Sequence, residues 1–424
     1  MIANLTLALL ETPRDIPLPL PLPEWLLVFL LVFSFLLHIL FVNLMLGGAL
    51  IELWAEIKGK KIPDYDRLAR EIGKTITVNK SIAVVLGVAP LLSINALYTV
   101  FFYTANTATG TYWALLVPII TIAFLLLYLH KYTWDRLSDR KDLHISILVG
   151  AVVLLLFVPL VFLANINLML FPEQWANVEG FFSAVFMQNV FPRYFHFVTA
   201  SIAVTGLFLF WYMKRPVFRF EEIFESFERE TTLRMFYKTA LYASLFQILF
   251  GPLVLITLPE LGLSWDMVII ITIGAAVAIT AMVLMWGEIK GTQPIGRNFW
   301  KIALLLTITV GFMGTGRHVY RAVALEPHKV QMSLETIRFK DASRKARAEF
   351  EAQSNIKTAD FVVVRELGRL DRTMLNNAFS KQKGITDIKY LLPKKTIRIK
   401  FDADKNSKDN LYKLITEKGF KITN

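Results

Sequence analysis

The sequence predicts an all-α membrane protein of about eight transmembrane helices in two four-helix bundles, followed by a small α+β ferredoxin-like domain. Three observations lead to this fold class. Of the 424 residues, 55% are hydrophobic, and they gather in runs of roughly twenty, the length that crosses a bilayer as a helix. Lysine and arginine are concentrated in alternate loops and in the C-terminal tail, as membrane topology requires. From residue 359 onward the hydrophobic period alternates between that of strands and that of helices.

The apolar runs set the expected boundaries. The chain divides into an N-terminal segment with a helix-breaking proline run (1–23), a transmembrane domain (24–320), a charged helical connector (321–358) and the small domain (359–424). The spans are expected at 24–53, 81–103, 112–130, 145–166, 194–213, 237–258, 266–286 and 299–317. Eight spans place both ends of the transmembrane domain on one side of the membrane.

Charge sets the expected orientation. The loops after the odd-numbered spans are basic, whereas 104–111 and 259–265 contain no Lys or Arg and 167–193 contains only Arg193. The positive-inside rule makes the basic loops cytoplasmic, so both termini are expected on the periplasmic side of the cytoplasmic membrane of a prokaryote. Topology thus accounts for the net charge of +12, and membrane lipids rather than nucleic acid are the expected surroundings.

Two spans begin alike, which indicates an internal duplication of four helices. Leu37-His38-Ile39 leads to Trp54, and Phe195-His196-Phe197 leads to Trp211. In the small domain, periodicity predicts the order strand, helix, strand, strand, helix at 361–364, 372–382, 387–391, 396–401 and 408–418.

The chain contains no cysteine. This excludes disulfides, thiolate metal sites, iron–sulfur clusters and covalent attachment of heme c within the chain. Any redox centre must therefore be held by histidine, methionine or carboxylate.

Three of the six histidines, His38, His196 and His318, lie within or at the ends of the expected spans, in what would be the outer half to the middle of the membrane. Such a residue either hydrogen-bonds to a neighbouring helix or has a function. The more specific functional hypothesis is that these histidines bind heme iron between helices. Met267 is expected at the same depth as His196 and is a candidate second ligand, although a methionine in an apolar helix usually serves packing. His130, at the cytoplasmic end of its span, is expected to be solvated, and His144 and His328 are expected to have no special role.

Two segments resemble subunit I of cytochrome bd quinol oxidases: Leu37–Gly48 around His38 and Arg193–Gly206 around His196. The resemblance covers roughly residues 24–320. It implies that His38 matches the histidine of the active-site heme and that His196 matches the ligand of the low-spin heme b. Trp265-Asp-Met267-Val268 looks like the segment with the second ligand of that heme, and Gly316-Arg317, followed here by His318, looks like the start of the Gly-Arg-Gln-Pro-Trp element.

The resemblance implies two or more hemes b, a possible quinol donor, a paralogous bd-like subunit or a homodimer, and a possible cytochrome c partner.

The chain also departs from the family. Ile122 and His130 stand where the family has carboxylates, Gly314 stands where it has a heme-ligating glutamate, the quinol loop is shortened to about 259–265, and the ninth helix is missing. Oxygen reduction needs protons and a second active-site heme, so the departures argue against it and leave electron transfer.

The tail from about residue 360 to 422 resembles a heavy-metal-associated domain, most clearly at 384–390 and 410–420. The Cys-x-x-Cys of that family is replaced by Arg369-Leu-Asp-Arg372. Binding of soft metals is therefore not expected, and a docking or spacer role is favoured.

The expected function is that of a heme-b membrane cytochrome, an oxidoreductase that passes electrons in a respiratory chain between a quinol or partner subunit and an outer-face carrier. One alternative is a terminal oxygen reductase subunit with relocated acidic ligands, for which Glu52 and Asp266 are the nearest carboxylates. Another is a membrane transporter or sensor with a tail derived from a metal-binding domain, which predicts charged residues along a central path.

Overall fold

In a computed structural model the protein is described from residue 20 to residue 423, except for 292–294, 354 and 393–394. The predicted N-terminal segment 1–23 therefore lies almost entirely outside the described residues. The chain divides into two compact units, Met1–Met332 and Ser333–Asn424.

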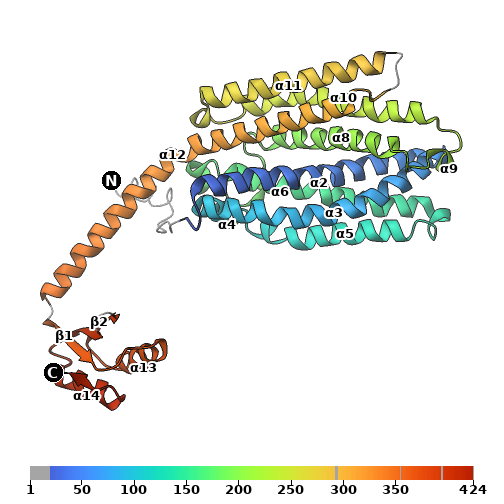
Figure 1. The fold of residues 1–424 in the computed structure, drawn as a ribbon. Helices are drawn as coiled ribbons and strands as arrows, with labels where there is room; N and C mark the ends of the chain where they lie inside the picture. Colours follow the sequence, from blue (N-terminus) through green and yellow to red (C-terminus); the bar gives the residue numbers. More distant parts are fainter. Residues whose placement is uncertain (1–19, 292–294, 354, 393–394, 424) are drawn as a thin grey trace. The chain divides into compact units, whose positions relative to one another are not determined.

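The first unit is a bundle of long helices (Figure 1). Its helices are α2 (Glu24–Gly59), α3 (Pro63–Leu97), α4 (Thr99–Ala114), α5 (Leu116–Tyr132), α6 (Lys141–Leu168), α7 (Phe181–Val185), α8 (Val190–Lys214), α9 (Phe220–Ile223), α10 (Arg229–Ile256), α11 (Trp265–Lys290) and the first part of α12 (Phe299–Gln353). Eight stretches of the described helices are long and apolar enough to cross a membrane, with α4 and α5 counted together. The prediction of about eight transmembrane helices is confirmed, and the protein is a multi-pass membrane protein.

The connections define two ends of this bundle. The first end is called the basic end, and α9 marks it in Figure 1. Here α2 connects to α3, α5 to α6, α8 to α10 and α11 to α12. We call the other end the opposite end. A separate hydrophobic core lies toward each: Trp134, Phe220 and Met285 belong to the core near the basic end, and Tyr98, Phe171 and Met267 belong to the core near the opposite end.

The two halves of the bundle meet where α2 packs against α8, the helices that contain His38 and His196. The hydroxyl of Ser201 donates to Asn43 Oδ1 at 2.9 Å, and the hydroxyl of Thr205 donates to the Asn43 carbonyl at 3.1 Å. Gly47 lets the backbones approach so closely that a Cβ on it would lie 2.1 Å from the carbonyl oxygen of Ser201. Small residues and interhelical hydrogen bonds thus hold the halves together, as is common between membrane helices.

Replacing Gly47 by Leu is expected to separate α2 from α8 and to lower the unfolding temperature in detergent by several degrees. Overpacking costs roughly 1–3 kcal/mol or more where backbone atoms must move. Gly287→Leu on α11 is the matched control, because nothing lies within 4 Å of a Cβ there. Equal unfolding temperatures for the two variants would contradict this account of the contact.

One predicted loop is helical. Residues 104–111 were expected to connect two spans, but they lie in α4, which is interrupted only at Gly110, where φ is 49°. The hydroxyls of Thr104 and Thr109 donate to carbonyls one turn back, at 2.7 and 3.0 Å. Phe101, Phe102 and Ala105 are buried in the core near the opposite end. This packing outweighs the polar, loop-like composition of the segment.

The second unit contains a four-stranded antiparallel sheet in the order β2-β3-β1-β4. Its elements after α12 are β1 (Ile356–Val363), α13 (Arg369–Phe379), β2 (Ile385–Leu391), β3 (Thr396–Asp402), α14 (Lys408–Glu417) and β4 (Ile422–Thr423). Phe379 of α13 and Ile415 of α14 share one core with Phe361 and Ile399 of the sheet. The order of elements and strands is that of a ferredoxin-like domain, which confirms the predicted fold class.

Candidate functional site

His38 lies on α2, and its side chain faces α3. Its Nδ1 lies 2.8 Å from the carbonyl oxygen of Ala83. A carbonyl only accepts hydrogen bonds, so Nδ1 carries the hydrogen and Nε2 keeps its lone pair. Gly87 packs against the ring, because a Cβ on it would lie 2.9 Å from Cε1 of His38. A histidine with one nitrogen held by a backbone acceptor and the other bare is oriented as metal-ligating histidines are.

His196 and Arg193 lie one turn apart on α8, near the opposite end. The Nδ1 of His196 is shielded from solvent and has no hydrogen-bond partner among the described residues. The same holds for Nη1 of Arg193. Buried polar atoms normally have partners, so this part of α8 has bonding capacity that the described chain leaves unused.

Helix α12 brings three further polar side chains to the same region. His318 also has a buried Nδ1 without a partner, and Arg317 and Arg321 each have a buried Nε without one, again among the described residues. The guanidinium of Arg317 lies 5.7 Å from the ring centre of Phe35, one turn before His38 on α2. His196 and His38 therefore each have an arginine about one turn nearer the opposite end.

Among the described residues, the three arginines form a positive cluster without an acidic partner. Arg317 is close enough to Arg193 and Arg321 for their charges to repel one another. Within the described part of the chain no carboxylate lies within 4 Å of any of them, whereas Glu173 pairs with His328 at 3.7 Å. Buried charge without compensation costs several kcal/mol per group. The cluster is therefore suited to an anionic group between the helices.

Met267 lies in the first turn of α11 and is fully buried in the core near the opposite end. Its backbone N–H donates to the hydroxyl of Ser264 at 3.3 Å, which caps the helix. No hydrogen bond joins Met267 to His196 in the described structure. The neighbouring carboxylate of Asp266 is exposed, so it does not reach into the bundle as a buried ligand would.

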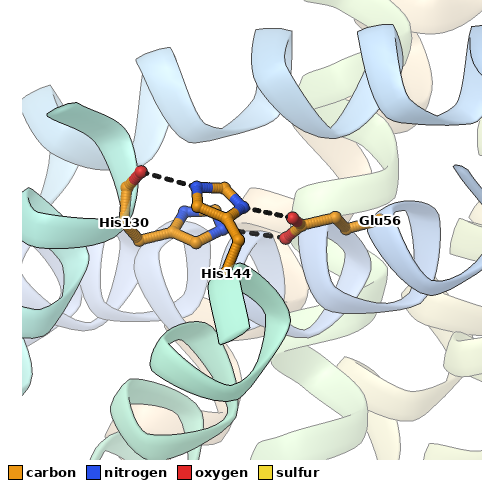
Figure 2. Close-up of side chains that lie close together, drawn as sticks. All are labelled: Glu56, His130 and His144. Atoms are coloured by element: carbon orange, nitrogen blue, oxygen red, sulfur yellow. Dashed lines mark hydrogen bonds and ion pairs between the residues drawn. The ribbon is translucent and has the colours of Figure 1, made fainter. Parts of the chain in front are cut away.

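The expectation that His130 is solvated is wrong, and His144 is not an ordinary interfacial residue. Both are buried, with exposed fractions of 2% and 0%, and both contact Glu56, as Figure 2 shows. His130 stands beside Lys131 at the end of α5, but α6 returns alongside α5 and covers that end. The signal in the sequence was the pair Glu52 and Glu56, one turn apart at the end of an apolar span.

Glu52 belongs to this group near the basic end, and its Oε1 lies 3.5 Å from Nδ1 of His130. It is 14 residues from His38 on the same helix, a separation of about 21 Å at the rise of an α-helix. Glu52 is therefore too far away to ligate a metal held by His38.

No protein-family model matches the chain, and no curated protein matches it. Among solved structures, the chain is similar to a chain of the bd oxidase from Geobacillus thermodenitrificans, with a TM-score of 0.56 and 14% sequence identity. The similarity covers 77% of this chain and 96% of that chain. At this identity the likeness concerns the fold, and the transmembrane part thus has a bd-oxidase-like fold.

Proposed function

We propose that the protein is a membrane cytochrome that binds heme b near the opposite end of its bundle and passes electrons between a quinol or partner subunit and a carrier outside the membrane. The observation that carries the proposal is the cluster of Arg193, Arg317 and Arg321 beside histidines with unused nitrogens. The bd-oxidase-like fold supports it.

The residues present fit heme. Two propionates would supply the negative charge that the arginine cluster lacks among the described residues, and His196 and His38 would supply imidazole nitrogens to iron. In this proposal His196 with Met267 holds one heme and His38 holds another, with His318 beside them. Heme b would supply reversible one-electron exchange, and the sulfur ligand would raise its potential.

The chain's own residues would orient the group and keep water away from it. The Ala83 carbonyl fixes the ring of His38 through Nδ1. The arginines would neutralise the propionates and favour the reduced state through their positive charge. The positive-inside rule assigns the basic end to the cytoplasm of a prokaryote, so electrons would leave toward the periplasm. A bd-like second subunit or a second copy is the partner that the fold suggests.

Oxygen reduction is the weaker candidate. Glu52 is about four helical turns from His38, and Asp266 is exposed, so neither carboxylate is well placed to replace the missing acidic ligands.

The proposal predicts that a quinol reduces the bound heme in the absence of oxygen, while oxygen consumption stays near the rate of protein-free controls. The measurement is anaerobic stopped-flow absorbance of the purified protein with a water-soluble quinol, followed by an oxygen electrode. Rapid quinol-driven oxygen uptake would instead identify a terminal oxidase.

A further inference from the structure

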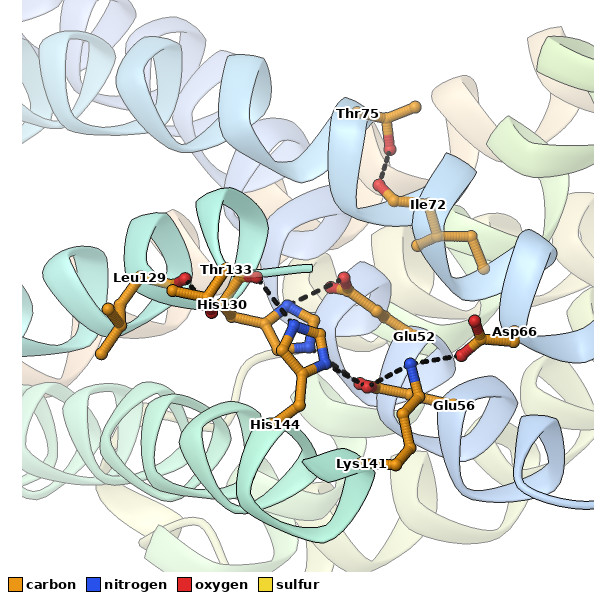
Figure 3. A network of polar contacts seen from close by, with 10 residues as sticks. All are labelled: Glu52, Glu56, Asp66, Ile72, Thr75, Leu129, His130, Thr133, Lys141 and His144. Carbon is orange, nitrogen blue, oxygen red and sulfur yellow. Dashed lines mark hydrogen bonds and ion pairs between the residues drawn. The ribbon is translucent and has the colours of Figure 1, made fainter. Parts of the chain in front are cut away.

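We propose that Glu56, His130 and His144 form a binding site for a divalent transition-metal ion, which joins α2, α5 and α6 at the basic end. One ligand atom from each residue lies within 4.8 Å of the others, and all three residues are buried. Figure 3 shows that the side chains converge from three different helices. This site is separate from the proposed heme region and does not depend on it.

The hydrogen bonds of His144 leave its Nδ1 atom available as a metal ligand. His144 Nε2 lies 2.8 Å from the carbonyl oxygen of His130, so Nε2 carries the hydrogen, and in the neutral ring Nδ1 is bare. That bare nitrogen faces Oε1 of Glu56. A backbone carbonyl that fixes the outer nitrogen of a histidine is the usual support around a metal ligand.

His130 faces the same carboxylate from α5. Its Nε2 lies 2.8 Å from Oε2 of Glu56, and its Nδ1 lies 3.5 Å from the Glu52 carboxylate. Glu52 can thus support His130 in the way that carboxylates support zinc-bound histidines. Two imidazole rings thus face one carboxylate, an arrangement that a bound metal ion or shared protons would stabilise.

The local charge is compatible with a divalent cation. Lys141 contacts both Glu56, at 3.0 Å, and Asp66. If the charge of Lys141 is set against that of Asp66, the Glu56 carboxylate remains beside the two imidazoles, with the buried side chain of Glu52 next to them. Two histidines and a carboxylate are ligands that Zn²⁺ and Fe²⁺ accept, with water as a further ligand. Tetrahedral ligands at about 2.0–2.1 Å are roughly 3.3 Å apart. The Nε2 atom of His130, 2.8 Å from Glu56, would therefore move by about half an ångström, and Nδ1 of His144, which lies closer to Glu56, would move further.

The test measures zinc bound to the full-length protein in detergent, purified with a tag that contains no histidine. After exposure to Zn²⁺ and passage over a chelating resin, the unaltered protein is expected to retain about one zinc per chain. Glu56→Gln and His144→Ala are expected to retain less than about a tenth of that amount. His328→Ala is the matched control and is expected to retain the zinc. Heme content, measured on the same samples, is expected to be unchanged.

Two outcomes would overturn the site. Either the unaltered protein retains no zinc, in which case the cluster holds only protons, or the Glu56 and His144 variants retain as much as the unaltered protein, in which case the ion is adventitious. Should these variants fail to fold, Lys141→Met provides an independent test. Removing the competing ammonium is expected to tighten zinc binding, and weaker binding or none in this variant would also contradict the proposal.

Discussion

Replacing His196 by Ala is expected to remove about one heme per chain and to leave the heme held at His38 in place. His196 lies on α8 with a buried Nδ1 that has no partner in the described chain, whereas His38 is oriented separately by Ala83 on α3. The two proposed sites have no ligand in common. The measurement is heme content per protein, combined with the reduced-minus-oxidised spectrum.

His38→Ala is expected to remove the complementary part of that spectrum, and His328→Ala is the control that removes a histidine outside both sites. The spectra of the two site variants should add up to that of the unaltered protein. Unchanged heme content in His196→Ala would contradict the assignment of this ligand, and loss of all heme in both variants would indicate a single shared site.

Removing the charge of Arg193 is expected to lower the midpoint potential of the heme at His196. A positive charge stabilises the reduced, electron-carrying state. For a charge about 8 Å from iron at an effective dielectric of about 20, the interaction is about 2 kcal/mol, or roughly 90 mV for one electron. The measurement is a spectroelectrochemical titration of Arg193→Gln.

Two variants serve as controls for this titration. Arg193→Lys keeps the charge and is expected to shift the potential much less. Arg215→Gln removes a charge at the far end of the same helix, where Arg215 stacks on Trp211 at 4.8 Å, and is expected to leave the potential unchanged. A potential that rises in Arg193→Gln, or that shifts equally in Arg215→Gln, would argue against an arginine cluster that faces heme propionates.

Apolar length and charge were sufficient to predict the membrane fold, because a helix that crosses lipid must be long and apolar whatever it packs against. They failed at 104–111, where Phe101 and Phe102 anchor a helix of loop-like composition. In the C-terminal domain, the spacing of hydrophobic residues was likewise sufficient to predict the fold, since each element packs one face on a shared core.

The site residues show a similar division. His38 and His196 stand out in the sequence because a polar imidazole in an apolar span is costly and therefore usually functional. Arg321 and Glu56 are not among the site residues that the sequence predicts, since the significance of each depends on residues from other helices. Arg-x-x-His at 193–196 and Arg-His-x-x-Arg at 317–321 have helical spacing that could have suggested the cluster. The burial of His130 and His144 depends on how α6 packs, which their local sequence does not specify.

The measurement that tests the central claim most directly is the pyridine hemochrome spectrum of the unaltered protein, purified in detergent from cells that are supplied with heme precursor. The account predicts the spectrum of heme b, with more than one heme per chain and no covalently bound heme left on the denatured chain. A colourless protein, made under conditions in which it folds, would contradict the account and would favour a transporter or sensor.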